Sequence, residues 1–350
     1  MNTTTASIST STGSSQSDYD VIVIGGSYAG LSGALQLGRA RRRVLVVDAG
    51  QRRNRFASNS HGFLTRDGEP AAAIAAKGRA DVAAYPSVEW HDGLALDARV
   101  DGDGFVVGLG NGAHARGRRI VLATGVRDEL PAIAGLAERW GQSVFHCPYC
   151  HGYELDQGRI GVLASSPMSL HQAQMLPDWG RVTFFTNGVC PLDSAQLADL
   201  AQRGVQVEHT LIDRIDATAT VVLQDGRRAD MDGLFTFGRL HLASPIAQQL
   251  GCAIDQGPLG SLIRTDEMRQ TTVPGVFAAG DAIRNAGNVA NAVLDGAMAA
   301  ISAHRSLLFG ITPFQASPQV AAQVAAQAAA PPAAALPMPA AADQARPAHA

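Results

Sequence analysis

Two of the four cysteines, Cys147 and Cys150, are separated by only two residues. A pair with this spacing can close into a small disulfide ring, and the pattern lowers a thiol pKa so that thiolate forms near neutral pH. Thiolate is the species that attacks disulfides, so the pair predicts thiol–disulfide exchange. His151 follows directly, and a histidine can take a thiol proton and return it. The alternative is that His151 is only a hydrogen-bonding neighbour.

Three other interpretations of the pair are weaker. Cys147–His151 also fits a c-type haem attachment motif, but such haems are normally attached outside the cytoplasm, and the Ser/Thr-rich segment 1–17 lacks the features of a secretory signal. A zinc site needs about four ligands, whereas Cys190 and Cys252 stand alone and are expected to be small core residues, so we expect no metal. The flanking His146 and His151 argue against an inert, buried pair.

Strands and helices alternate on both sides of the pair. We expect strands at Tyr19–Ile24, Arg43–Val47, Arg119–Ala123, Arg159–Ala164, Arg181–Phe185 and Gly275–Ala278, helices at Ala29–Arg39, Met168–Leu176 and Asn291–Leu307, and short strands and turns over Asp81–Val107. This alternation is typical of a parallel sheet covered by helices. Two strand–helix–strand units, beginning near residues 20 and 160, predict an α/β fold with two Rossmann-like domains, the second inserted in the first.

A dinucleotide-binding turn is predicted at the end of the first strand, in the segment Gly25–Gly30. Gly25 permits the tight turn, Gly30 lets helix and strand pack closely, and the helix N-terminus presents unpaired N–H groups to a pyrophosphate. Ser27 replaces the middle glycine of the usual motif. Asp48 ends the second strand, about 20 residues further on, where a carboxylate accepts a hydrogen bond from a ribose hydroxyl.

Composition narrows the class of protein. With 350 residues and 46% hydrophobic content, the chain can form one large or two medium cores. The net charge of −3 gives no reason to expect binding to nucleic acid or to an anionic membrane. No run approaches the roughly 18 apolar residues of a membrane span, so we expect a cytoplasmic protein. Arg41–Arg43 is interpreted as a helix C-terminus, and Arg52–Arg53 is left open as a possible solvated loop.

Two later segments extend the dinucleotide pattern. Val121–Gly125 and Gly275–Asp281 are apolar strands that close on tight glycine turns, and they resemble the second and third FAD signatures of flavoproteins with two dinucleotide-binding domains. The whole arrangement, from about Asp20 to Leu308, resembles the low-molecular-weight thioredoxin reductases. The resemblance implies FAD as cofactor and a homodimer. It also implies that Cys150 faces the flavin and that Cys147 exchanges with substrate.

The resemblance further implies a domain division and a cofactor site. The expected domains are an FAD-binding domain in two parts (18–126 and 241–314) and a central NADPH-like domain that carries the cysteine pair (127–240), while composition alone predicts a disordered N-terminus (1–17) and a disordered Ala/Pro-rich tail (315–350). The residues expected to bind the cofactor are Gly25, Ser27, Tyr28, Ala29, Gly30, Asp48, Asn54, His61, Thr124, Gly125, Gly280, Asp281, Asn288 and Val289.

The chain departs from the reductases in three places. The second nucleotide turn, 164–169, reads Ala-Ser-Ser-Pro-Met-Ser and has none of the expected glycines, and Pro167 removes an N–H donor. The strand that follows ends at Phe184–Asn187 without the arginine cluster expected for a 2′-phosphate. At Gly287–Val289 an arginine that normally touches the flavin is missing, although Asn288 and the N–H of Val289 could keep some contacts. The central domain therefore resembles a scaffold that has lost its nucleotide.

Without a nicotinamide, thiols must supply the electrons. The string Cys-Pro-Tyr-Cys-His-Gly-Tyr-Glu, 147–154, resembles that of dithiol oxidases from natural-product biosynthesis, of the gliotoxin, holomycin and romidepsin type. That resemblance implies a small-molecule dithiol substrate, O2 as the final acceptor and no use of NADPH. The alternatives are an NADPH-dependent disulfide reductase and, in another class, a non-catalytic flavin-bound redox sensor.

Overall fold

The structure, a computed structural model, describes residues 18–315. The predicted disorder of 1–17 and of the Ala/Pro-rich tail lies outside that range, apart from Gln315. No helix within residues 18–315 combines the length and the apolar character that a bilayer span requires.

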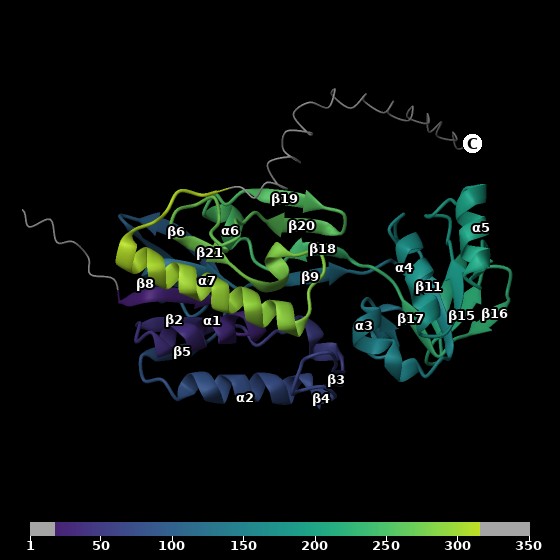
Figure 1. The fold of residues 1–350 in the computed structure, drawn as a ribbon, viewed down its shortest axis with the longest axis horizontal. Coiled ribbons are helices and arrows are strands. Elements are labelled where there is room, and N and C mark those ends of the chain that lie inside the picture. The colour runs from purple at the N-terminus through teal and green to yellow at the C-terminus, as the bar shows by residue number, and fades with distance from the viewer. Residues whose placement is uncertain (1–17, 316–350) are drawn as a thin grey trace, which may run out of the picture. The chain divides into compact units, whose positions relative to one another are not determined.

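The largest sheet is built from both ends of the described chain (Figure 1). Its parallel strands are β1 (Tyr19–Ile24), β2 (Val44–Asp48), β5 (Val88–Asp92) and β8 (His114–Leu122), in the order β5-β2-β1-β8, with β21 (Val276–Ala278) also pairing with β8. The strands β7 (Gly104–Leu109) and β6 (Ala95–Asp101) extend the sheet in antiparallel fashion. Val21 and Val23 enter one core and Ile22 and Ile24 another, so β1 is buried on both faces.

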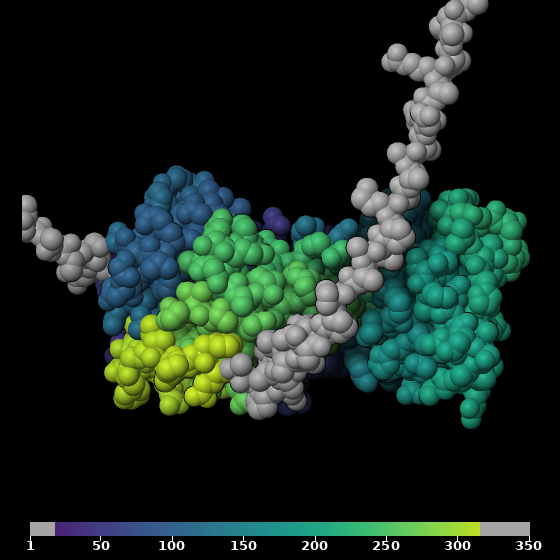
Figure 2. Space-filling model, turned by 90° about the horizontal axis from the view of Figure 1, so that it is seen from above, coloured from purple at the N-terminus to yellow at the C-terminus, as the bar shows by residue number. Residues whose placement is uncertain are grey.

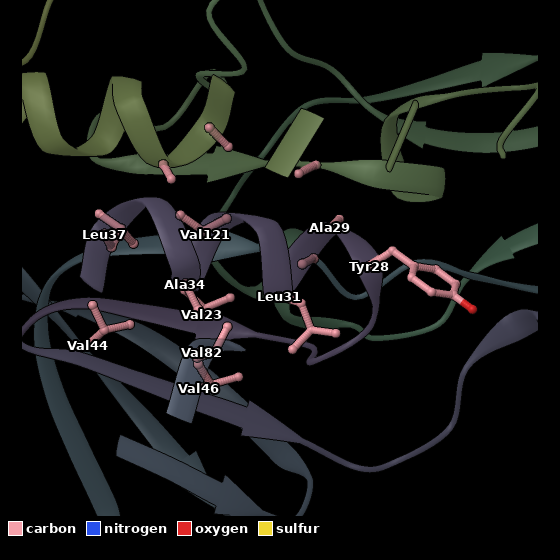
Figure 3. Close-up of a cluster of buried hydrophobic side chains, with 14 of the residues drawn as sticks. Val23, Tyr28, Ala29, Leu31, Ala34, Leu37, Val44, Val46, Val82 and Val121 are labelled. Carbon is pink, nitrogen blue, oxygen red and sulfur yellow. The ribbon is translucent and has the colours of Figure 1, made fainter. Parts of the chain in front are cut away.

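Three helices cover the face of Val21 and Val23: α1 (Tyr28–Arg39), α2 (Ala71–Ala83) and α7 (Val289–Phe309). Figure 1 shows α1 and α7 side by side, and Figure 3 shows part of the core beneath them, with Leu31, Ala34 and Leu37 of α1 near strand valines such as Val23, Val44 and Val46. A side chain at Gly296 of α7 would overlap the carbonyl of Ala29, so the two helices approach closely.

The helix α2 was not predicted, and the expectation of short strands and turns from Asp81 was wrong for Asp81–Ala83, which are helical. The first turns of α2 consist almost wholly of alanine, and only Ala71, Ile74, Ala75 and Val82 are buried. An apolar stripe this sparse gives little periodic signal, although alanine favours the helix strongly.

The opposite face of the sheet is covered by segments from the second half of the chain. Figure 2 shows green residues of that half beside blue residues of the first, and Ala98 of β6 donates its N–H to Gln249 of α6 (Ile246–Gln249) at 3.2 Å. The neighbouring four-stranded sheet has the order β19 (Ile254–Gly257), β20 (Gly260–Ile263), β18 (Arg239–Leu242) and β9 (Val126–Glu129). The proposed domain boundaries near 126 and 240 fall in β9 and β18, which pair with each other.

A second parallel sheet lies, in sequence, between β8 and β21. Its order is β10 (Val144–Phe145), β17 (Gly233–Phe235), β11 (Arg159–Leu163), β12 (Arg181–Phe185) and β13 (Gln206–Glu208). The helices α4 (Ser169–Met175) and α5 (Ser194–Gln202) and a small antiparallel sheet of β14 (Ile212–Asp216), β15 (Thr220–Leu223) and β16 (Arg228–Asp230) complete this part. The predicted α/β class, with one Rossmann-like unit inserted in another, is confirmed.

Candidate active site

The cysteine pair lies at the start of the short helix α3 (Pro148–His151). Cys147 is the N-cap residue, and Pro148 occupies the first helical position, where the missing N–H costs nothing. A disulfide joins the two cysteines, whose Cα atoms are 5.3 Å apart. Cys150 and His151 line a cavity, whereas Cys147 lies outside its lining. The two cysteines therefore have different surroundings, because only Cys150 contributes to the cavity lining.

The cavity brings together most residues that the sequence assigned to the cofactor. Those in its lining are Ser27, Tyr28, Ala29, Asn54, His61, Thr124, Gly125, Gly280, Asp281, Asn288 and Val289. They come from several segments that are far apart in the sequence, including the N-terminus of α1, the end of β8 and the start of α7. Gly25, Gly30 and Asp48 lie outside the lining.

These three residues hold the turn in place. Gly25 has a φ of 102°, and a side chain there would overlap the carbonyl of Ala123. A side chain at Gly30 would overlap the carbonyl of Gly25. Asp48 accepts a hydrogen bond from the N–H of Gly26 at 3.1 Å. The glycines therefore let the turn pack closely against its neighbouring backbone, and the N–H groups of the first turn of α1 have no partner inside the helix.

Asn54 provides a test of whether the cavity suits a ligand. Its Nδ2 donates to the hydroxyl of Tyr28 at 3.1 Å, and that hydroxyl donates to the carbonyl of Ala71 at 3.0 Å. The Oδ1 of Asn54 is buried and has no hydrogen-bond partner in the protein. A buried acceptor without a donor is costly, and a ligand N–H or O–H in the cavity would satisfy it. Together with the glycine turn, this residue fits a dinucleotide such as FAD.

Arg53 is a cavity residue that the sequence interpretation missed, because the Arg52–Arg53 pair was left open as a solvated loop. It lies in the short helix η1 (Arg53–Phe56) and contacts two carboxylates, Asp128 through Nε and Nη2 at 2.8 and 2.6 Å and Asp281 through Nη1 at 2.9 Å. Burial lowers the pKa of Arg53, but the two carboxylates outweigh burial and raise it overall, so the side chain stays charged. Arg53 places a guanidinium in the cavity, although the arginine expected from the resemblance at Gly287–Val289 is missing.

Asn288 has a structural role that the sequence did not suggest. It is the N-cap residue of α7, and its side-chain oxygen accepts a hydrogen bond from the N–H of Asn291 at 2.7 Å. The side chain therefore begins the helix in the way expected of asparagine. Asn288 and its neighbour Val289 also line the cavity.

Two partly buried histidines flank the cysteine pair. His151 stacks on Phe145 with ring centroids 4.3 Å apart, and burial, assisted by the nearby His61, lowers the pKa of His151 to about 4. Burial and the charge of Arg53 lower the pKa of His146 to about 3. Both imidazoles are therefore neutral at pH 7 while the disulfide is closed.

A histidine and a carboxylate lie close together beside these residues. His61 Nδ1 is 3.2 Å from Oε1 of Glu154, and the more exposed Asp67 lies 3.7 Å from the same nitrogen. Glu154 belongs to η3 (Tyr153–Leu155), which follows α3, whereas His61 follows β3 (Asn59–Ser60) in the hairpin with β4 (Glu69–Pro70). The sequence indicated neither the pairing nor a role for Glu154.

In the second nucleotide turn, a serine side chain already occupies backbone N–H groups that could otherwise bind a phosphate. Ser169 is fully buried, and its Oγ accepts hydrogen bonds from the N–H groups of Ser165 and Ser166 at 3.1 and 3.4 Å. These amides lie in the turn after β11, where a pyrophosphate would otherwise be bound. From the same helix, Gln172 is fully buried and donates to the carbonyl of His146 at 2.9 Å, which ties α4 to the cysteine segment.

The remaining cysteines are buried in separate cores, as the sequence predicted. Within residues 18–315, no group of three or more His, Cys, Asp and Glu side chains is placed to hold a metal ion.

Comparison with known proteins finds relatives that are named thioredoxin reductases. The chain is 33% identical over 304 residues to "Thioredoxin reductase tcpT" of Claviceps purpurea, covering 83% of this chain and 94% of the relative. It is 32% identical over 285 residues to "Thioredoxin reductase sirT" of Leptosphaeria maculans, covering 75% of this chain and 86% of the relative. The predicted resemblance to thioredoxin-reductase-like flavoproteins is thereby confirmed.

Solved structures agree. An oxidoreductase from Agrobacterium tumefaciens is 57% identical with a TM-score of 0.82, covering 83% of this chain and 99% of that one. The protein HlmI is 35% identical with a TM-score of 0.78, covering 88% and 96%. The model of the family described as "Pyridine nucleotide-disulphide oxidoreductase" matches residues 19–296. With this match and a disulfide beside a dinucleotide-type cavity, the chain is an oxidoreductase that belongs to the pyridine nucleotide-disulphide oxidoreductase family.

Proposed function

We propose that the protein is an FAD-dependent dithiol oxidase that closes an intramolecular disulfide in a small-molecule natural product, with O2 as acceptor and without NADPH. The observation that carries the proposal is the second nucleotide turn. Its amides already donate to the buried hydroxyl of Ser169, so a pyrophosphate would have to displace an existing contact. Electrons then have to enter as thiols at the disulfide rather than as hydride from a nicotinamide.

The chain's own residues account for the thiol chemistry. A substrate thiolate attacks Sγ of Cys147, the disulfide breaks, and Cys150 leaves as a thiolate that faces the cavity. The second substrate thiol loses its proton and attacks the mixed disulfide, so that the product leaves as a cyclic disulfide and Cys147 departs as a thiolate. Since both thiols belong to one molecule, the second step is intramolecular. When bound, FAD would accept the two electrons of the reduced pair and pass them to O2, giving hydrogen peroxide.

His151 is the proposed proton carrier beside Cys150. Its imidazole is neutral while the disulfide is closed, because burial disfavours the charged form. A thiolate formed at Cys150 is an opposite charge next to the ring, and it favours the imidazolium. Proton uptake by His151 is therefore coupled to the opening of the disulfide.

The residues that would hold FAD are those of the cavity and of the turn below it. We propose that the pyrophosphate binds at the N-terminus of α1, between Gly25 and Gly30, and that Asp48 accepts from the adenosine ribose. Asp281 lies in the cavity lining, where it would bind the ribityl chain, and Arg53 holds its carboxylate. Thr124, Gly125 and the N–H of Val289 would complete the site.

The relatives leave a second candidate. Two of them carry the name thioredoxin reductase, which favours an NADPH-dependent reductase that acts on a protein disulfide. The two functions predict opposite electron donors, so one experiment separates them.

Anaerobic titration of the purified protein tests the proposal. Dithiothreitol alone should bleach the flavin absorbance, and air should restore it with the release of hydrogen peroxide, whereas NADPH should leave the spectrum unchanged. Stoichiometric bleaching by NADPH would instead establish the reductase. We also propose a homodimer and a cytoplasmic location, which gel filtration with light scattering and cell fractionation would test.

A further inference from the structure

Arg52 lies in the cavity next to Arg53, but the two side chains have different surroundings. Both residues line the cavity, and Arg53 contacts the carboxylates of Asp128 and Asp281, which line it too. Arg52 forms an ion pair with neither of these, nor with any other carboxylate of residues 18–315, and its buried Nε has no hydrogen-bond partner there. Arg52 therefore brings a positive charge into the cavity that no carboxylate balances.

The segment that carries Arg52 is attached to the start of α1. Asn54, two residues further on, donates to the hydroxyl of Tyr28, the first residue of α1, at 3.1 Å. Two residues of chain span about 7 Å at most, so Arg52 lies close to this contact. Burial raises the pKa of Tyr28, and the hydrogen bond from Asn54 and the charge of Arg52 oppose that rise. The charge of Arg52 therefore acts at the N-terminal end of α1.

The N-terminus of α1 is itself positive. Ser27 is the N-cap residue, but its side chain makes no capping hydrogen bond, and the first turn contains no acidic residue. Asp48, which accepts from the N–H of Gly26, lies outside the cavity lining. A helix N-terminus carries about half an elementary positive charge, which disfavours a cation nearby. A bound anion would relieve this repulsion, and a pyrophosphate can accept from helix N–H groups and a guanidinium together.

We propose that Arg52 binds the pyrophosphate of FAD together with the N-terminus of α1, and that its charge destabilises the FAD-free protein. The inference rests on the proposed FAD-dependent function and assigns a role to a residue that the sequence interpretation left open. It also separates two adjacent arginines, because Arg53 holds the acidic side chains of the cavity and Arg52 binds the cofactor.

Release of FAD from the purified holoenzyme tests the binding role. After dilution to concentrations near the dissociation constant, the rise in flavin fluorescence reports the FAD that has left the protein. A hydrogen bond to a charged group contributes about 10–100-fold in affinity, so Arg52→Gln should weaken FAD binding by about that factor. Arg52→Lys keeps the charge and should weaken binding less.

ADP distinguishes the pyrophosphate from the flavin ring, because it carries the first without the second. Added ADP should displace FAD from the wild-type protein, and its dissociation constant should rise about 10–100-fold in Arg52→Gln. The matched control is Arg55→Gln. Arg55 follows in the same segment, is exposed and lies outside the cavity lining, so this variant loses the same charge and should bind FAD and ADP as the wild type does.

The stability of the FAD-free protein separates a binding residue from a structural one. Without FAD, the charge of Arg52 opposes the helix N-terminus, so Arg52→Gln should have a urea midpoint equal to or above that of the wild type. At a fixed, high concentration of FAD the order should reverse, because the wild type binds FAD more tightly and gains more stability. A residue that only supports the fold would lower the midpoint in both states.

The outcomes separate the two proposals. If the purified wild type contains no flavin and takes up no added FAD, the proposed function is wrong. If the wild type binds FAD and Arg52→Gln binds FAD and ADP equally tightly, the role of Arg52 is wrong and the oxidase proposal stands. The role of Arg52 would also be overturned by a loss of FAD affinity without a loss of ADP affinity, by a wild type from which ADP displaces no FAD, or by a lower urea midpoint of FAD-free Arg52→Gln.

Discussion

The buried charge cluster of Arg53 offers the sharpest test of the cavity. Arg53→Met removes the guanidinium and keeps an apolar stem of similar length. The side chain of Arg53 is 18% exposed, and those of Asp128 and Asp281 are 7% and 21% exposed. The substitution would leave these two adjacent carboxylates without a cation. Breaking a buried ion pair costs about 3–5 kcal/mol, and the partial exposure of Arg53 and Asp281 favours the lower value, about 3 kcal/mol.

Urea denaturation monitored by flavin release measures this loss. With a slope of about 3 kcal/mol per molar urea, a loss of about 3 kcal/mol lowers the midpoint by about 1 M. Arg53→Lys keeps the charge but not the fork that binds both carboxylates, so its midpoint should lie between those of the wild type and Arg53→Met.

The matched control is Arg214→Met. Arg214 also contacts two carboxylates, Asp213 and Asp216, but its side chain is 45% exposed. Exposed pairs contribute little, so the midpoint of this variant should stay near that of the wild type. Equal midpoints for the Arg53 and Arg214 variants would refute the argument that burial of the cluster makes it important.

Three further predictions follow from the site. Cys150→Ser leaves Cys147 as a lone thiol, which should attack an added aromatic disulfide such as dithionitrobenzoate, release one thiol and keep the other half as a mixed disulfide visible by mass spectrometry of the intact protein, whereas Cys147→Ser should react more slowly through Cys150, and equal rates for the two variants would contradict the assigned roles. Ser169→Ala leaves two partly buried N–H groups without their acceptor and should cost about 1 kcal/mol in thermal or urea unfolding, while a neutral result would mean that the turn admits water. Because the pKa values of His146 and His151 in the folded protein, about 3 and about 4, lie below the ordinary value of 6.5, the unfolded chain binds more protons between pH 4 and pH 6.5, and stability should fall as pH falls through that window. Unfolding midpoints that stay constant between pH 6.5 and pH 4 would show that neither ring is held neutral.

The sequence was informative where chemistry depends on neighbours along the chain. The glycine turn at Gly25–Gly30 and the cysteine pair are local patterns, and the first strands are buried on both faces, so their apolar runs are unambiguous. The loss of glycine in the turn 164–169 could also be seen in the sequence. Only the structure shows its consequence, which is that the hydroxyl of Ser169 accepts hydrogen bonds from the N–H groups of Ser165 and Ser166.

Contacts between distant segments could not be predicted in this way. Arg53 is one of several arginines in a short stretch, and only the fold brings Asp128 and Asp281 to it. Glu154 was visible in the cysteine motif, but its partner His61 lies in another part of the chain. In both cases the chemistry arises from a pair whose members are unremarkable alone.

The close fit of α7 against α1 has a consequence for biosynthesis. The hydroxyl of Ser32 donates to the carbonyl of Val293 at 2.7 Å, so the first helix reaches its final packing only after nearly all of the described chain has emerged from the ribosome. The inserted unit, 144–235, pairs its strands among themselves and can fold during translation. Until α7 has been synthesised, part of the apolar surface of α1 stays exposed. We therefore expect chaperones to bind the nascent N-terminal half.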